Sequence, residues 1–179
     1  MPNRALVLFG LAVILIGVNL SIFSKETQLA EGEAIFMELA PVDPRSLMQG
    51  DYMALNYAVS QSVREAMWAR EGRTETYQVP DNQDGLVVVR RDARGVGEFV
   101  RLDDGTPLAD DERRLKFRFR DGMVKLATNA FFFQEGTGEL YVPARYGAFR
   151  VSEQGELLLV ALHDEQLQPL GSKASGSKE

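Results

Sequence analysis

Four residues in the first third of the chain have the types and the spacing that a polar site requires. Asp43 and Arg45 lie two residues apart, and Asp51 is followed directly by Tyr52. Together they could form a cluster of carboxylate, guanidinium and phenol groups. Such a cluster could clamp a turn, because a guanidinium binds a carboxylate through two parallel hydrogen bonds. It could also bind a small ligand or serve an envelope hydrolase, so both uses stay open.

The rest of the sequence offers little else for catalysis. It has one histidine, His163, beside Asp164, and no cysteine, so a disulfide, a cysteine nucleophile and a thiolate metal site are excluded. A serine–lysine hydrolase of the signal-peptidase kind would need a serine eight residues before the Gly-Asp pair. That position holds Val42, and Ser46 lies too close to Gly50. We therefore predict no catalytic residue, no metal and no cofactor.

The charges narrow the range of partners. A net charge of -6 and a pI near 5.0 argue against nucleic-acid binding. Acidic residues gather at positions 103, 104 and 110–112, but they lack the spacing of a calcium-binding loop. We expect a solvated surface loop there.

The apolar run near the N-terminus decides the expected compartment. Nineteen residues, Ala5 to Phe23, contain no charge, and as a helix they would span about 28 Å, close to the ~30 Å of a bilayer's hydrocarbon. Arg4 precedes the run and acidic residues dominate beyond it, which favours a cytoplasmic N-terminus and an exported body. A cleaved signal peptide is the alternative. The run is longer than the apolar part of a signal peptide, and no suitable cleavage site follows it directly.

We thus expect three parts. Residues 1–24 form a transmembrane anchor, residues 25–170 form one extracytoplasmic domain, and residues 171–179, which are polar apart from one alanine, form a disordered tail. The expected location is the bacterial inner membrane, crossed once, with the domain in the periplasm.

The body is expected to be mainly β with minor α, an antiparallel β-rich domain with one or two short helices. Residues 34–39 alternate in polarity as a strand does. In the segment after Gly50, the pattern places two sets of residues on opposite faces: Asp51, Met53, Leu55 and Tyr57 on one, and Tyr52, Ala54 and Asn56 on the other. Residues 59–72 are the best helix candidate, with Ser60 as a possible N-cap and Trp68 as a core aromatic residue. A second short helix is expected in residues 139–146.

Two hairpins can be predicted from their turns. Asp121-Gly122 favours a two-residue type I′ turn, which places Arg118 opposite Lys125 and Phe119 opposite Val124. One face of this hairpin is then apolar and the other basic. We expect the basic face to be solvated or matched by carboxylates of a neighbouring strand, and contact with acidic lipid headgroups or an acidic partner is the alternative. Residues 148–151 and 156–162 form a closing hairpin. Because residues 157–162 are apolar on both faces, we expect a central strand that is covered on both sides.

The chain resembles a known family through the segment 50–57. The defined positions of the consensus GDYXXLXY are all occupied, by Gly50, Asp51, Tyr52, Leu55 and Tyr57. Segments 39–46, 132–136 and 144–151 also look like parts of that family. The resemblance implies a membrane-anchored bacterial protein, from a family often encoded near larger multi-spanning membrane proteins. It implies no activity and no catalytic residue.

Two functional hypotheses follow. In the first, the domain is a non-catalytic interaction or accessory module for a membrane-protein partner. Its expected contacts are the bilayer and a multi-spanning membrane protein, and no nucleic acid is expected. In the second, it is an unrecognised hydrolase or ligand-binding domain that uses Asp43, Arg45, Asp51 and Tyr52.

Overall fold

The computed structural model describes residues 4–40, 48–49, 52–70 and 82–171. The chain divides into two compact units, Met1–Gly32 and Glu33–Glu179. Each unit is described by itself. The predicted boundaries of anchor, domain and tail stay a prediction, and all of the tail except Gly171 lies outside the described residues.

The first unit is built on a single helix, α1 (Arg4–Glu31). Its apolar side chains between Leu6 and Phe23 are exposed, as expected of a helix that buries them in lipid rather than in protein. Of the helices that the structure describes, α1 alone is long and apolar enough to cross a membrane, and a signal sequence near an N-terminus meets the same criterion. The helix continues beyond the apolar run by eight residues, through the polar segment 24–31.

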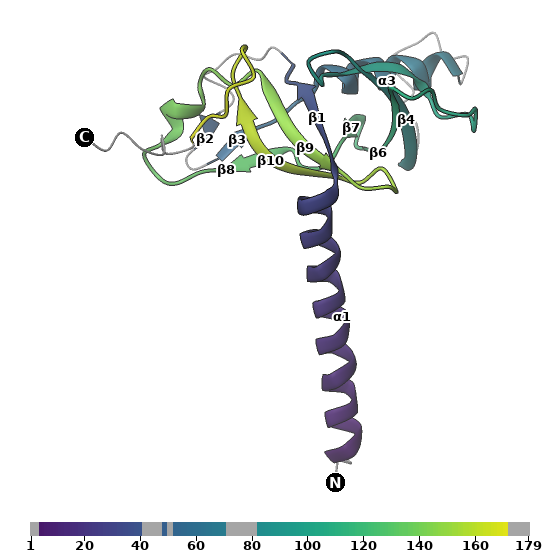
Figure 1. Ribbon diagram of the computed structural model, residues 1–179, viewed down its shortest axis with the longest axis vertical. Helices are drawn as coiled ribbons and strands as arrows, with labels where there is room; N and C mark the ends of the chain where they lie inside the picture. The colour runs from purple at the N-terminus through teal and green to yellow at the C-terminus, as the bar shows by residue number, and fades with distance from the viewer. Residues whose placement is uncertain (1–3, 41–47, 50–51, 71–81, 172–179) are drawn as a thin grey trace. The chain divides into compact units, whose positions relative to one another are not determined.

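The second unit contains three antiparallel sheets. The first has the order β1-β9-β10, the second β2-β3-β8 and the third β5-β4-β6-β7. The strands are β1 (Glu33–Glu38), β2 (Met48–Gln49), β3 (Tyr52–Ala54), β4 (Gln83–Arg91), β5 (Gly97–Leu102), β6 (Glu112–Arg120), β7 (Met123–Lys125), β8 (Ala130–Phe132), β9 (Tyr146–Val151) and β10 (Leu157–His163). A fold that is mainly β with minor α is therefore confirmed (Figure 1).

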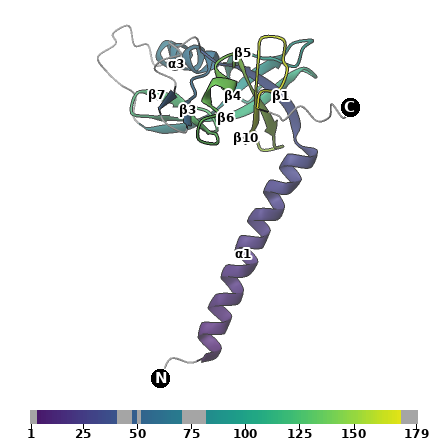
Figure 2. The same cartoon turned by 90° about the vertical axis from the view of Figure 1, so that its left-hand side faces the viewer.

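The helical elements of this unit are α3 (Ala58–Arg70) and the 3-10 helix η1 (Gly138–Tyr141). In both views α3 lies over one face of the third sheet (Figures 1 and 2). Its residues Val59, Val63 and Met67 recur one turn apart and are buried, which is the pattern of a helix packed on a sheet.

Helix α3 begins two residues before the predicted N-cap. Ser60 lies inside the first turn, and its amide donates to the Tyr57 carbonyl at 3.0 Å. The N-cap prediction was wrong because the chain turns directly from the strand-like segment at Tyr57 into the helix. The predicted end at Gly72 lies outside the described residues.

The sheets are joined by short backbone contacts. Phe36 of β1 donates its amide to the Gly95 carbonyl at 2.9 Å, and Lys116 of β6 donates to Gly155 at 2.8 Å. Leu39 forms an isolated bridge with Tyr57. The core cluster takes side chains from all three sheets and α3, so one core serves the whole β-rich unit.

The hairpin β6–β7 matches its prediction. Asp121 and Gly122 both have positive φ, 53° and 76°, as a type I′ turn requires. Arg118 pairs with Lys125, and Phe119 with Val124. Local turn chemistry is enough to set this register.

One expectation in the last third of the chain was wrong. β10 lies at the edge of its sheet, and β9 is central because it pairs with β1 on one side and β10 on the other. The pairing register shifts between Leu159 and Ala161, and the skipped residue, Val160, is 50% exposed. The second short helix is present as η1, and it ends at Tyr141, two residues before Pro143, which cannot continue a helix.

Candidate functional site

The segment 52–57 alternates between core and surface. Met53, Leu55 and Tyr57 are buried, whereas Tyr52 is half-buried and Asn56 is exposed. The face assignment made from the sequence is therefore confirmed for these residues. The Leu55 amide donates to the Asn129 carbonyl at 2.7 Å, so the segment keeps pairing beyond β3.

Tyr57 is tied into the core at both ends of its side chain. Its hydroxyl donates to the Thr128 carbonyl at 2.9 Å, and its ring meets Phe149 edge-on with centroids 5.6 Å apart. Burial raises the pKa of the Tyr57 phenol well above its ordinary value. A neutral, hydrogen-bonded phenol in this position links the segment just before β8 to β9 and is unsuited to act as a base.

Tyr52 faces the other way and meets an exposed aromatic residue. It pairs across the β3–β8 ladder with Phe132, and the two ring centroids are 5.7 Å apart. Phe132 is 73% exposed. Its neighbours Phe131 and Phe133 instead contact the Tyr141 ring, at 5.0 and 5.4 Å, so the surface aromatic pair consists of Tyr52 and Phe132.

The remaining members of the motif and of the predicted polar cluster cannot be placed. Gly50, Asp51, Asp43 and Arg45 all lie outside the described residues. Their proximity to one another stays a prediction, and of the four residues of the hydrolase hypothesis the structure describes Tyr52.

The basic face of the β6–β7 hairpin is partly matched by carboxylates. Lys116 pairs with Glu156 at 3.3 Å and Arg120 with Asp84 at 2.6 Å. Arg118 donates to the Ala127 carbonyl at 3.4 Å. The pair of Lys116 and Glu156 is exposed to solvent and therefore adds little to stability.

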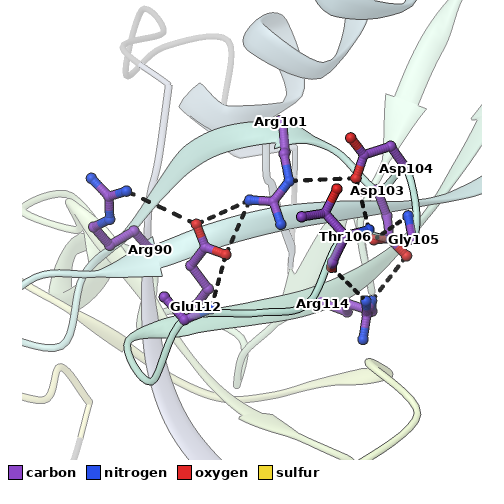
Figure 3. A network of polar contacts seen from close by, with 9 residues as sticks. Arg90, Arg101, Asp103, Asp104, Gly105, Thr106, Glu112 and Arg114 are labelled. Carbon is purple, nitrogen blue, oxygen red and sulfur yellow. Dashed lines mark hydrogen bonds and ion pairs between the residues drawn. The ribbon is translucent and has the colours of Figure 1, made fainter.

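The acidic loop before β6 is more structured than expected (Figure 3). Glu112 is 6% exposed, and both of its oxygens accept from Arg101 Nη1 at 3.0 Å. Arg114 Nε donates to Asp103 at 2.9 Å. A fully solvated loop was the wrong expectation, because two of its acids pair with arginines of β5 and β6.

These pairs favour a structural use of the loop. Hydrogen bonds from the Arg101 guanidinium lower the pKa of Glu112. A carboxylate held in its charged form by such partners is a poor general acid. In the part of the chain that is described, no three or more His, Asp or Glu residues are arranged to hold a metal ion.

His163 also has local partners. Its Nδ1 donates to the Leu167 carbonyl at 2.9 Å, and its ring meets Phe36 edge-on at 5.1 Å. With Nδ1 occupied in this way, the ring braces the turn after β10. This is the capping role that a lone histidine usually has.

The fold and the site define a class of protein. It combines one N-terminal helix that could anchor in a membrane with a β-rich unit whose alternating segment 52–57 contributes to the core on one face. The family model for the GDYXXLXY protein matches residues 14–162, and the chain belongs to this family. No curated protein and no solved structure matches the chain.

The sequence reasoning missed two features. It treated Phe132 only as part of a resembling segment, although a run of three phenylalanines in a strand must turn one to the opposite face. It also assigned Ser60 and Trp68 separate roles, as an N-cap and a core aromatic residue, and did not notice that Ser60, Arg64 and Trp68 recur at the same four-residue spacing as the apolar stripe, one position later.

Proposed function

We propose that this protein is a single-pass, membrane-anchored accessory module without catalytic activity. Its β-rich domain lies in the bacterial periplasm and docks onto a multi-spanning membrane protein through Tyr52 and Phe132. The observation that carries the proposal is the surface pairing of Phe132, which is 73% exposed, with Tyr52, the first tyrosine of the GDYXXLXY consensus.

The chemistry of this pair fits a docking surface. Aromatic side chains are enriched in protein interfaces and among the residues that contribute most to binding. A Phe that is 73% exposed contributes little to the core, and burying its ring in an interface would remove a large apolar area from solvent. The antiparallel pairing of β3 with β8 holds the two rings together before binding, which reduces the ordering cost of association.

A membrane anchor would favour such an interaction. A helix like α1, restricted to the bilayer, raises the effective concentration of the domain near integral membrane proteins. The asymmetry of charge, with Arg4 before the apolar run and acidic residues after it, supports a cytoplasmic N-terminus. A modest docking surface is then sufficient.

The proposal can be tested by crosslinking in intact membranes. A photoreactive benzoylphenylalanine placed at Phe132 should give one discrete adduct with a second protein that stays in the membrane after alkaline extraction. The matched control is the same group at Met123, a side chain that is 50% exposed at the β6–β7 hairpin. The control should give no adduct of that size.

Two alanine variants distinguish a loss of docking from a loss of folding. Tyr52→Ala should reduce the Phe132 adduct at least fivefold, and Phe132→Ala should leave the melting temperature within about 2 °C of the wild type, because surface substitutions have small effects. The proposal is wrong if Met123 gives the same adduct in the same yield. It is also wrong if Phe132 crosslinks only within its own chain.

A further inference from the structure

The outer edge of β8 carries the backbone groups of Phe132. β8 is the last strand of the second sheet, whose order is β2-β3-β8. The Leu55 amide donates to the Asn129 carbonyl at 2.7 Å, and such hydrogen-bonded pairs alternate with non-hydrogen-bonded pairs along an antiparallel ladder. Met53 and Phe131 are therefore the next hydrogen-bonded pair. The amide and the carbonyl of Phe132 consequently point away from β3, to the free side of the strand.

Threonine residues take up the edge groups on both sides of Phe132. Thr128 Oγ1 donates to the Ala130 carbonyl at 2.9 Å and accepts from the Ala130 amide at 3.3 Å. Beyond the strand, the Gln134 carbonyl accepts from Thr137, from its amide at 3.0 Å and its hydroxyl at 2.6 Å. In the part of the chain that the structure describes, no group meets the amide or the carbonyl of Phe132. These two groups form the edge gap of β8.

The two tyrosines of the consensus lie on either side of this edge gap. The Tyr57 hydroxyl donates to the Thr128 carbonyl at 2.9 Å, which fixes the residue whose side chain closes the edge at Ala130. Tyr52 lies opposite Phe132 in a non-hydrogen-bonded pair, where side chains approach each other most closely. One tyrosine thus closes the neighbouring position, and the other supports the ring beside the gap.

The chemistry of the edge gap specifies its complement. An amide and a carbonyl that both point outward from one strand residue match the carbonyl and the amide of one residue in an extended chain. When a strand is added to a sheet edge, these backbone hydrogen bonds supply affinity and the side chains supply specificity. The residue opposite Phe132 directs its side chain to the same face as the Phe132 ring, which is 73% exposed. An apolar side chain at that position would bury both.

A second copy of the chain fits the edge gap less well than a partner segment does. Pairing two β8 strands about Phe132 would set Ala130 of each copy against Gln134 of the other, since the sequence offsets are equal. Both positions are already closed by threonine residues. A short extended segment has no such fixed turns, so its ends can leave the edge on either side of the gap.

We propose, on the basis of the docking function proposed above for Tyr52 and Phe132, that the partner docks by adding an extended segment to the edge of β8. The segment pairs its backbone with the amide and the carbonyl of Phe132 and packs an apolar side chain on the Phe132 ring. The contact on the partner is then a strand-like segment in the same compartment as the domain.

The direction of the Phe132 amide can be tested in the free, full-length protein in detergent micelles. Phenyllactic acid in place of Phe132 keeps the ring and exchanges the amide N–H for an ester oxygen. The melting temperature should fall by no more than about 2 °C, because only the preceding carbonyl is weakened. The matched control is phenyllactic acid in place of Phe131, whose amide faces β3. It should lower the melting temperature by about 4 °C or more. Equal losses would show that the Phe132 amide is already paired within the chain, and the proposal would fail.

Docking itself is measured with a probe beside the edge gap. The chain has no cysteine, so Gln134→Cys, at an exposed position, can carry a benzophenone maleimide in isolated membranes, and the chain without this cysteine gives the background. The probe should give an adduct with the same membrane protein as the probe at Phe132. Phenyllactic acid in place of Phe132 should reduce this adduct about fivefold, the typical effect of one lost hydrogen bond.

The outcomes separate strand addition from the docking function on which it rests. If Phe132→Ala reduces the Gln134 adduct and phenyllactic acid does not, the ring docks without backbone pairing. Strand addition is then wrong, and the docking function stands. An adduct of twice the mass of the chain would assign the edge gap to a second copy and would also overturn the proposal. Absence of an adduct from both probe positions would overturn the docking function, and strand addition with it.

Discussion

Among single residues, Tyr57 shows how a consensus position can serve the fold. Its ring is buried against Phe149, and its hydroxyl satisfies the carbonyl of Thr128, 71 residues away in sequence. A phenylalanine would fill the same space but would leave that carbonyl without its donor. The hydroxyl explains why a tyrosine occupies this position.

The difference in free energy of unfolding between the wild type and Tyr57→Phe should decrease at high pH. Burial raises the pKa of Tyr57 in the folded protein, so above the ordinary pKa of about 10 the unfolded chain loses this proton first. The stability that the tyrosine contributes is therefore present below pH 10 and is lost as the pH rises toward the folded-state pKa. The loss is about 1.4 kcal/mol per pH unit relative to Tyr57→Phe.

The measurement is urea unfolding of both proteins between pH 8 and 11. At pH 8 the wild type should be more stable by about 1 kcal/mol, the typical contribution of one hydrogen bond. The difference should shrink above pH 10 and approach zero near pH 11. A constant difference over the whole range would mean that the Tyr57 hydroxyl is accessible to solvent and titrates normally.

The sequence predicts on which face of a strand a side chain lies better than it predicts which residue of the neighbouring strand lies opposite. Tyr52 and Tyr57 were assigned to opposite faces because side chains alternate along any strand, and the structure agrees. Phe132 as the partner of Tyr52 could not be predicted. Their pairing depends on a contact between residues 80 positions apart, for which local pattern gives no register.

Among the elements, the β9–β10 hairpin is joined to β6 at a glycine. Gly155 has φ +80°, and its carbonyl accepts from the Lys116 amide at 2.8 Å. A Cβ atom at this position would lie 2.7 Å from the Arg114 carbonyl oxygen. The hairpin can therefore approach the third sheet this closely only because the residue has no side chain.

Gly155→Ala should destabilise the protein by roughly 2–3 kcal/mol. About 1–2 kcal/mol comes from the left-handed backbone, and about 1 kcal/mol from the hydrogen bond that the clash would break. The control is Gly105→Ala, where φ is +85° and nothing lies within 4 Å of the added atom. It should lose only the backbone part, and equal losses in denaturant unfolding would show that the close contact with β6 contributes nothing.

The elements differ in how far the sequence specifies them. The β6–β7 hairpin was predicted with its register, because Asp121 and Gly122 fix the turn locally. The edge position of β10 was not, because it depends on β1 pairing with β9 more than 100 residues later in the chain. An apolar strand can lie at an edge or in the centre, and only the long-range pairing decides.

For the whole molecule, the N-terminal helix has two interpretations with different consequences. A helix of this length and composition fits a membrane anchor and also a signal sequence. The polar extension of α1 from residue 24 to Glu31 continues the helix past the apolar run. The two interpretations differ in whether this helix is present in the mature protein.

The topological prediction is that the N-terminus stays in the cytoplasm and the domain is exported. An alkaline phosphatase fused after Glu179 should be active, because its disulfides form only outside the cytoplasm, whereas the same enzyme fused at Met1 should be inactive. Sequencing of the purified protein should find Met1 to Phe23 retained.

Moving the positive charge, by Arg4→Glu together with Glu26→Lys and Glu31→Lys, should reduce the activity of the C-terminal fusion. A mature N-terminus near Ala30 would overturn the anchor but leave the export intact, and an inactive C-terminal fusion would overturn the export itself.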